Sequence, residues 1–183
     1  MRAHASLLVL LLAAIAPSIE GSQRRVELQE LQANRAKWQR HGITDYEFRQ
    51  RDETCFCMYG PYYGPIRVIV AKGKVKKAIY EGERRDGYWP GRLVREKTEL
   101  VATVEDVFRR ADGVINARSK APYTIRYDPT YGFPTMIDVQ NPPGMADAQW
   151  RLVVDGFTPR KSQPDRSESS NQAMQRTAGR AVF

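Results

Sequence analysis

Residues 66–80 read IRVIVAKGKVKKAIY, and this stretch decides the fold of the chain. Apolar and basic residues alternate on both sides of Lys72-Gly73, which is typical of two antiparallel strands joined by a two-residue turn. The alternation predicts three pairs on one face of the hairpin: Val70 with Val75, Val68 with Lys77, and Ile66 with Ile79. Lys77 is the awkward member of this set, because its charged end must reach past the sheet edge to water.

Two helices and four more strands are predicted around the hairpin. Apolar periodicity indicates the first helix, and Thr103 caps the second. The predicted elements are a helix at 24–40, a strand at 44–51, the hairpin, a helix from 104 to shortly before Pro122, and strands at 123–127, 135–139 and 151–157. Residues 81–100 are predicted to form a long loop. Gly113, inside the second helix, costs about 1 kcal/mol relative to alanine.

The order of these elements is helix, three strands, helix, three strands. Runs of strands joined by short turns are typical of antiparallel sheets, and helices beside such a sheet define an α+β fold. We therefore predict an α+β protein with an antiparallel sheet of about five to six strands and two helices packed on one face.

Both ends of the chain differ in composition from its middle. Residues 1–22 are predicted to be a signal peptide, because Arg2 precedes an apolar run that is too short to span a bilayer. Residues 162–183 show no helical or strand period and are predicted to be a disordered tail. Residues 23–161 form a single predicted α+β domain. The protein is expected to be exported, periplasmic or secreted, with no transmembrane span after signal cleavage. An uncleaved membrane anchor is the alternative.

The chain carries a formal net charge of +8 at pH 7. The basic surplus is densest between Lys72 and Lys97, and such a surplus favours anionic surfaces. A solvated basic hairpin explains the same residues without any partner. Nucleic-acid binding is not predicted, because the sequence shows neither aromatic and basic residues interleaved on one face nor a recognised binding motif.

Cys55-Phe56-Cys57 contains the only two cysteines of the chain. In an extended segment the two sulfur atoms would point to the same face of the strand. A disulfide across so short a loop requires a kink and would constrain the unfolded chain by only ~1.6 kcal/mol. Three interpretations of Cys55 and Cys57 therefore stand side by side: a strained disulfide, a plain thiol pair, and a metal or redox site.

Catalytic and metal-binding groups are scarce in the sequence. Tetrahedral zinc needs four ligands, whereas the chain offers two sulfurs and His41, whose place at a helix end is explained by the helix dipole. Copper(I) fits two thiolates better. A cysteine paired with His41 is the one nucleophilic arrangement available. Asp128 and Asp138 could face each other across a hairpin, although turn initiation explains Asp128 without catalysis. We predict that the protein is not an enzyme and has no cofactor and no metal site.

Several short motifs occur together in one order along the chain. They are Trp38, Tyr46-Glu47-Phe48, Cys55-Phe56-Cys57, Pro65 with Val68 and Val70, Gly73 with Val75, the run 103–108, the run 127–134, and Ile137-Asp138. With these motifs the chain resembles a family of small exported bacterial proteins catalogued as domain of unknown function 6174. The resemblance implies an envelope location and a shared α+β domain, and it implies no activity. Many relatives look like lipoproteins, whereas this chain lacks a cysteine that could accept a lipid.

The functional expectation is a non-catalytic envelope domain that binds a partner protein or a small ligand. The arm with Cys55 and Cys57 and the turn near residue 130 are the candidate binding surfaces. The turn residues predicted to bind are Tyr127, Asp128, Tyr131, Gly132, Phe133 and Pro134. The alternative is a thiol redox or copper(I)-handling protein that uses the two cysteines. An inhibitor that presents residues 81–100 is a third hypothesis.

Overall fold

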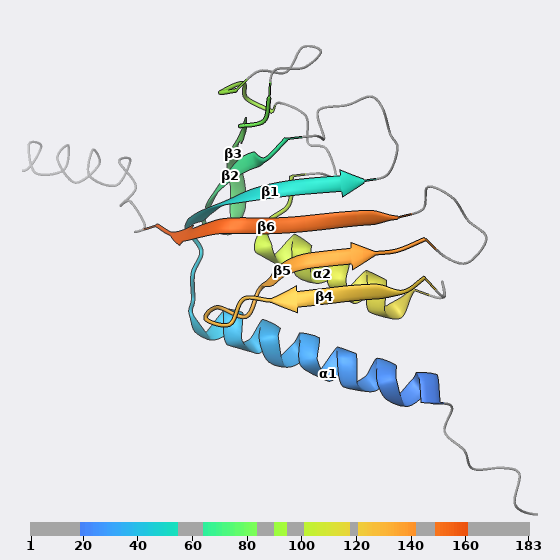
Figure 1. Ribbon diagram of the computed structural model, residues 1–183. Helices are drawn as coiled ribbons and strands as arrows, with labels where there is room; N and C mark the ends of the chain where they lie inside the picture. Colours follow the sequence, from blue (N-terminus) through green and yellow to red (C-terminus); the bar gives the residue numbers. More distant parts are fainter. Residues whose placement is uncertain are drawn as a thin grey trace, which may run out of the picture.

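The computed structural model describes residues 19–54, 64–83, 90–94, 101–117, 121–141 and 149–160 (Figure 1). The elements are α1 (Ile19–Arg40), β1 (Tyr46–Thr54), β2 (Ile66–Ala71), β3 (Lys74–Tyr80), α2 (Val104–Asn116), β4 (Tyr123–Tyr127), β5 (Pro134–Val139) and β6 (Trp150–Pro159). The strands form one antiparallel sheet in the order β3-β2-β1-β6-β5-β4. The predicted α+β class and the order of the elements are confirmed.

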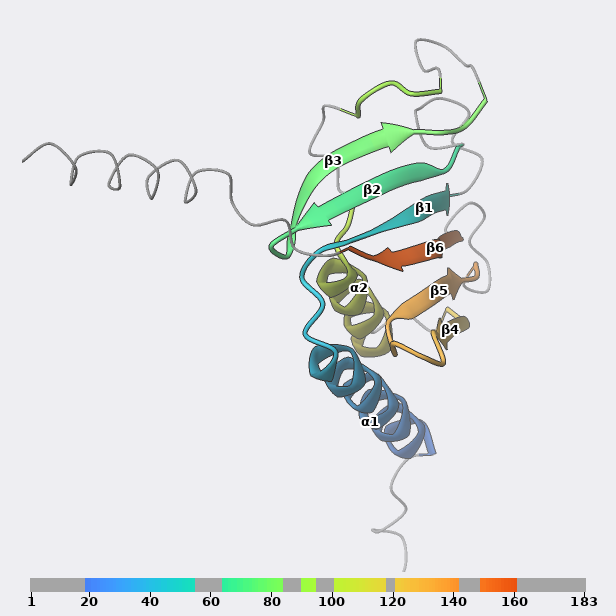
Figure 2. The ribbon, with the colours of Figure 1, turned by 90° about the vertical axis from the view of Figure 1, so that its left-hand side faces the viewer.

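The two helices lie on the same side of the sheet. Helix α2 covers the middle of one sheet face, and α1 lies beside α2, beyond the edge formed by β4 (Figures 1 and 2). The core between α2 and the sheet includes Phe48, Val68, Ile137, Leu152 and Phe108. Neighbouring strand residues such as Arg49, Arg67 and Arg151 are more exposed, as expected for a sheet with one face in water. No helix in the described part of the chain is long and apolar enough to span a membrane.

The β2–β3 hairpin has a different register from the predicted one. The observed pairs are Val70 with Val75, Ile69 with Lys77, Val68 with Ala78, and Ile66 with Tyr80. The first pair was predicted correctly, and the others are shifted by one residue because β3 contains a bulge after Val75. The bulge removes Lys77 from the core face and brings in Ala78 and Tyr80, which are both buried. The core face of β3 therefore carries the apolar Ala78 and the aromatic Tyr80 in place of the charged Lys77.

The helix boundaries also differ from the predicted ones. Helix α1 begins at Ile19, five residues before the predicted start at 24. Helix α2 ends at Asn116, several residues earlier than Pro122 suggested. Ile115 is its last buried residue, and Ala117 already has an extended backbone with ψ at 139°. The helix therefore ends one residue after its last buried side chain.

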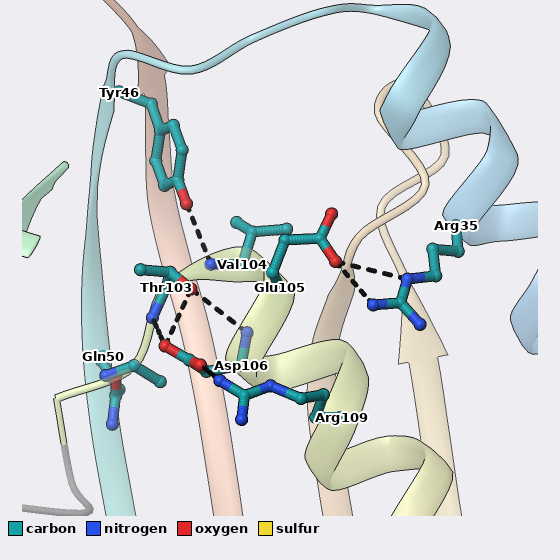
Figure 3. A network of polar contacts seen from close by, with 9 residues as sticks. Arg35, Tyr46, Gln50, Thr103, Val104, Glu105, Asp106 and Arg109 are labelled. Carbon is teal, nitrogen blue, oxygen red and sulfur yellow. Dashed lines mark hydrogen bonds and ion pairs between the residues drawn. The ribbon is translucent and has the colours of Figure 1, made fainter. Parts of the chain in front are cut away.

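Polar side chains tie the start of α2 to strand β1 (Figure 3). Thr103 and Asp106 form a reciprocal capping box at the helix N-terminus. The backbone N–H of Val104 donates to the Tyr46 hydroxyl at 3.0 Å, and the N–H of Ala102 donates to Oε1 of Gln50 at 3.0 Å. Backbone donors that a helix start leaves without intrahelical partners are thus satisfied by buried strand residues. This arrangement fixes the position of α2 along the sheet.

The buried Tyr46 predicts a loss of stability at high pH. Burial raises the pKa of its hydroxyl from 10 to about 12, although the hydrogen bond from Val104 opposes the shift. A raised pKa means that the fold favours the neutral phenol, so this contribution to stability is complete below pH 10 and is lost as the pH rises towards 12. The free energy of unfolding, measured with urea across this pH range, should fall less steeply for Tyr46→Phe than for the wild type. Equal slopes would contradict the assignment.

Candidate functional site

The turn between β4 and β5 adopts the predicted geometry. The Asp128 carboxylate accepts hydrogen bonds from the backbone N–H groups of Thr130 and Tyr131 at 2.8 and 2.7 Å. The N–H of Gly132 donates to the Asp128 carbonyl at 2.9 Å. Asp128 therefore initiates the turn, as the sequence predicted. Asp138 lies opposite Thr124 and pairs with Arg151 at 3.1 Å, so the two aspartates do not form a carboxylate pair.

The C-terminal half of α1 packs directly onto this turn. The Lys37 ammonium donates a hydrogen bond to the Pro129 carbonyl oxygen. His41 Nε2 lies 3.2 Å from the Thr130 carbonyl oxygen. A Cβ at Gly132 would lie 2.6 Å from the Asn34 carbonyl oxygen, so the two backbones are in close contact. The His41 ring also lies edge to face with the Tyr131 ring, and the two ring centroids are 5.2 Å apart. We call this contact between α1 and the turn the α1–turn joint.

An aromatic cluster lies beneath the joint. The Trp38 ring meets Tyr46, Phe133 and Phe157 edge to face, with centroids 5.5 to 5.9 Å apart. Of the predicted binding residues, Gly132, Phe133 and Pro134 are buried, whereas Tyr127, Asp128 and Tyr131 are half-buried. Gly132 packs against Asn34 and Phe133 against Trp38, so these two residues have a packing role. Partner binding by the turn stays a prediction, which rests on its partly exposed residues.

Two tyrosines of β4 face acidic residues of α1. The Tyr123 hydroxyl donates to Oε2 of Glu27, and burial, followed by this hydrogen bond, raises the pKa of Tyr123 to about 12. Burial and then the charge of Glu30 also raise the pKa of Tyr127. Both hydroxyls therefore stay protonated near neutral pH. Tyr123 therefore contacts α1 as a neutral hydrogen-bond donor.

Cys55 and Cys57 lie outside the described residues, directly after Thr54 at the end of β1. Their three interpretations therefore stay predictions. Thiol titration combined with intact-mass measurement, with and without reductant and copper(I), tests them. Within the described residues, no three His, Cys, Asp or Glu side chains converge on a position that could hold a metal ion.

A groove of about 780 Å³ lies beside α2, where β1 and β5 end and β4 and β6 begin. It is lined by Asp52, Val101, Ala102, Asp106, Arg109, Arg110, Gly113, Val114, Ala117, Ala121, Tyr123, Val139 and Trp150. Arg110, Gly113 and Ala117 follow one another at helical spacing along one flank of α2. Helix α1 contacts another part of α2, through the ion pair between Arg35 and Glu105 at 2.8 Å. The groove is therefore separate from the α1–turn joint.

The charges in the groove are balanced in pairs. Arg110 Nη1 lies 3.6 Å from Asp52 Oδ2, and these side chains are only 26% and 12% exposed. Arg109 pairs with Asp106 one turn earlier on the same helix. The rest of the lining is mostly apolar, with the Tyr123 and Trp150 rings on the strand side. Known small-molecule sites have this volume class and this mixture of an apolar lining with a few polar groups.

Gly113 gives the groove its open wall. A Cβ at this position would meet nothing within 4 Å, so close packing does not require a glycine. Replacement by alanine should raise the free energy of unfolding by about 0.5–1 kcal/mol, because a helical glycine is entropically unfavourable. Urea unfolding of Gly113→Ala measures this effect. A lower stability than the wild type would contradict the open space at Gly113.

The sequence reasoning missed the groove because its lining comes from distant segments. Only Gly113 was an early signal, as a glycine in the middle of a strongly periodic helix without an evident packing reason. Asp52, Trp150 and Val139 meet only after β1, β6 and β5 have paired. No local motif marks such a site.

A family model for a family of unknown function, DUF6174, matches residues 30–159. The chain belongs to this family. The match extends from within α1 to the end of β6, so DUF6174 covers the whole sheet, α2 and the C-terminal half of α1. The resemblance seen in the sequence motifs is thereby confirmed. No curated protein and no solved structure gives a match. Membership in DUF6174 supplies no activity.

Proposed function

We propose that this protein is a non-catalytic binding domain of the bacterial cell envelope that holds a small ligand in the groove beside α2. The observation that carries the proposal is a groove of about 780 Å³ beside α2, with Gly113 on its helical wall and nothing within 4 Å of a Cβ built there. Export is supported by the apolar run near the N-terminus, Leu7–Ala16. A non-catalytic role is supported by the pairing of each described groove carboxylate with an arginine, because an ion-paired carboxylate is a weaker general base.

The lining favours a ligand without net charge and with a substantial apolar part. The charges of Asp52 and Arg110 balance each other, as do those of Asp106 and Arg109, so a charged ligand group would have to break a pair. Val101, Val114 and Val139, with the Trp150 ring, offer apolar contact along the groove. Burial of apolar ligand surface against these side chains stabilises the complex by about 25 cal/mol per Å² of apolar area removed from water.

A fragment screen with ligand-observed NMR tests the proposal. Neutral aromatic and aliphatic fragments should bind the wild-type protein, and Gly113→Leu should abolish this binding by filling the groove from its helical wall. Asn116→Leu is the matched control, because Asn116 is exposed on the same helix and does not line the groove. Fragments that bind the wild type and Gly113→Leu equally well would refute the groove as the binding site. Circular dichroism confirms that both variants fold.

A further inference from the structure

The first half of β3 is an open edge of the sheet. Strand β3 is the outermost strand beside β2. Its second half is covered by residues 91–94, since the N–H of Tyr80 donates to Arg92 O and the N–H of Val94 donates to Ala78 O, both at 2.9 Å. In the described part of the chain, this covering segment stops short of Lys77. The edge from Lys74 to Lys77 therefore faces outward.

This edge carries positive charge from three lysines. The hairpin, residues 66–80, contains five basic residues and no acidic one. Lys74, Lys76 and Lys77 are exposed, and no ion pair joins any of them to another described residue. Two acidic residues close to the hairpin are paired with arginines. Glu81 pairs with Arg67 at 2.8 Å, and Glu47 lies 3.7 Å from Arg160.

The bulge in β3 places two of these lysines on the same face of the sheet. Lys74 lies opposite Ala71 and Lys77 opposite Ile69, so both belong to the open face of the sheet. Lys76 is the extra residue of the bulge. Val75 is 38% exposed and lies opposite Val70, so it belongs to the other face of the sheet. We call Lys74, Val75, Lys76 and Lys77 together the lysine edge. A bulged and charged edge also resists pairing with a strand of another chain.

We infer that the lysine edge docks the protein onto an anionic lipid surface. Lysines near such a surface are attracted by its negative potential, and three exposed lysines lie within the four residues of this edge. Nucleic acid is a poorer fit, because the one aromatic residue of the hairpin, Tyr80, is buried and cannot stack on bases. The inference goes beyond ligand binding in the groove. It shares with the proposed function only the envelope location, where an anionic lipid surface is within reach.

Vesicle sedimentation with the purified protein tests this inference. The protein should sediment with vesicles of equal parts phosphatidylglycerol and phosphatidylcholine, should not sediment with phosphatidylcholine alone, and should be released by high salt. Each lysine is expected to contribute about fivefold to the partition coefficient, so Lys74→Gln, Lys76→Gln and Lys77→Gln together should lower it roughly 100-fold.

A second triple variant controls for overall charge. Arg24→Gln, Arg25→Gln and Arg40→Gln remove the same number of charges from exposed positions of α1. This control should retain most of the binding. An equal loss in both variants, no binding by the wild type, or salt-sensitive binding to DNA but not to vesicles would overturn the inference. Self-association of the lysine variant without vesicle binding by the wild type would also overturn it, because the lysines would then serve only to protect the edge. If no fragment binds in the groove, the expected results of the vesicle experiment stay the same. The two proposals therefore fail independently.

Discussion

Replacement of Gly132 by alanine should lower the free energy of unfolding by about 3 kcal/mol or more. Gly132 has a φ of +85°, a conformation that costs an L-residue roughly 1–2 kcal/mol. The added Cβ would also lie 2.6 Å from the Asn34 carbonyl oxygen and 3.0 Å from Cβ of Lys37. Helix α1 would have to move away from the turn to admit it. Urea unfolding of Gly132→Ala measures the loss.

Gly42 provides the matched control for this prediction. It follows α1 with a φ of +60°, and a Cβ there would meet nothing within 4 Å. Gly42→Ala should therefore cost only the backbone strain, about 1–2 kcal/mol. The difference between the two variants measures the close contact in the α1–turn joint. Equal losses for Gly132→Ala and Gly42→Ala would mean that the contact with Asn34 contributes nothing.

Truncation of Trp38 to alanine should cost about 3–5 kcal/mol, the range found for buried large aromatic residues. Trp38 is 5% exposed and contacts three other aromatic rings edge to face. It is one of two fully buried residues that the described part of α1 contributes to the core, together with Leu31. Loss of the ring should therefore release much of the helix. Urea unfolding and near-ultraviolet circular dichroism measure both effects.

Val26→Ala is the control on the same helix. Val26 is 62% exposed, so its truncation should change the free energy of unfolding by less than about 0.5 kcal/mol. A loss below about 1 kcal/mol for Trp38→Ala would show that α1 is held by its polar contacts, such as that between Lys37 and Pro129, rather than by the aromatic cluster.

Local patterns were sufficient to predict the elements and their order. Alternation around Lys72-Gly73 located the β2–β3 hairpin, and Thr103 with its acidic first turn located the start of α2. The register beyond Val75 was predicted wrongly, because a bulge adds a residue without any change in composition. Lys77 was the visible sign of the error, since an unbroken register would have placed a charged side chain on the core face.

The candidate site was less predictable than the fold. The turn beginning at Asp128 was recognised, but the packing of Phe133 against Trp38 depends on how α1 returns to the sheet. Sequence patterns carry little information about such distant contacts. The groove depends even more on long-range pairing, because Asp52 and Trp150 meet only through the β1–β6 ladder. The sequence showed that Gly113 destabilises the helix relative to alanine, but not that it lines the groove beside α2.

A map of backbone amide chemical shifts tests the account most directly. Spectra of the labelled protein are recorded with each fragment that binds the wild type. We predict that the shifted resonances belong to the groove, with Gly113, Tyr123 and Trp150 among them, and that Thr130 and Tyr131 on the turn stay unchanged. Shifts centred on Asp128 to Tyr131, with the Gly113 and Trp150 resonances unmoved, would contradict the account and return the binding function to the turn.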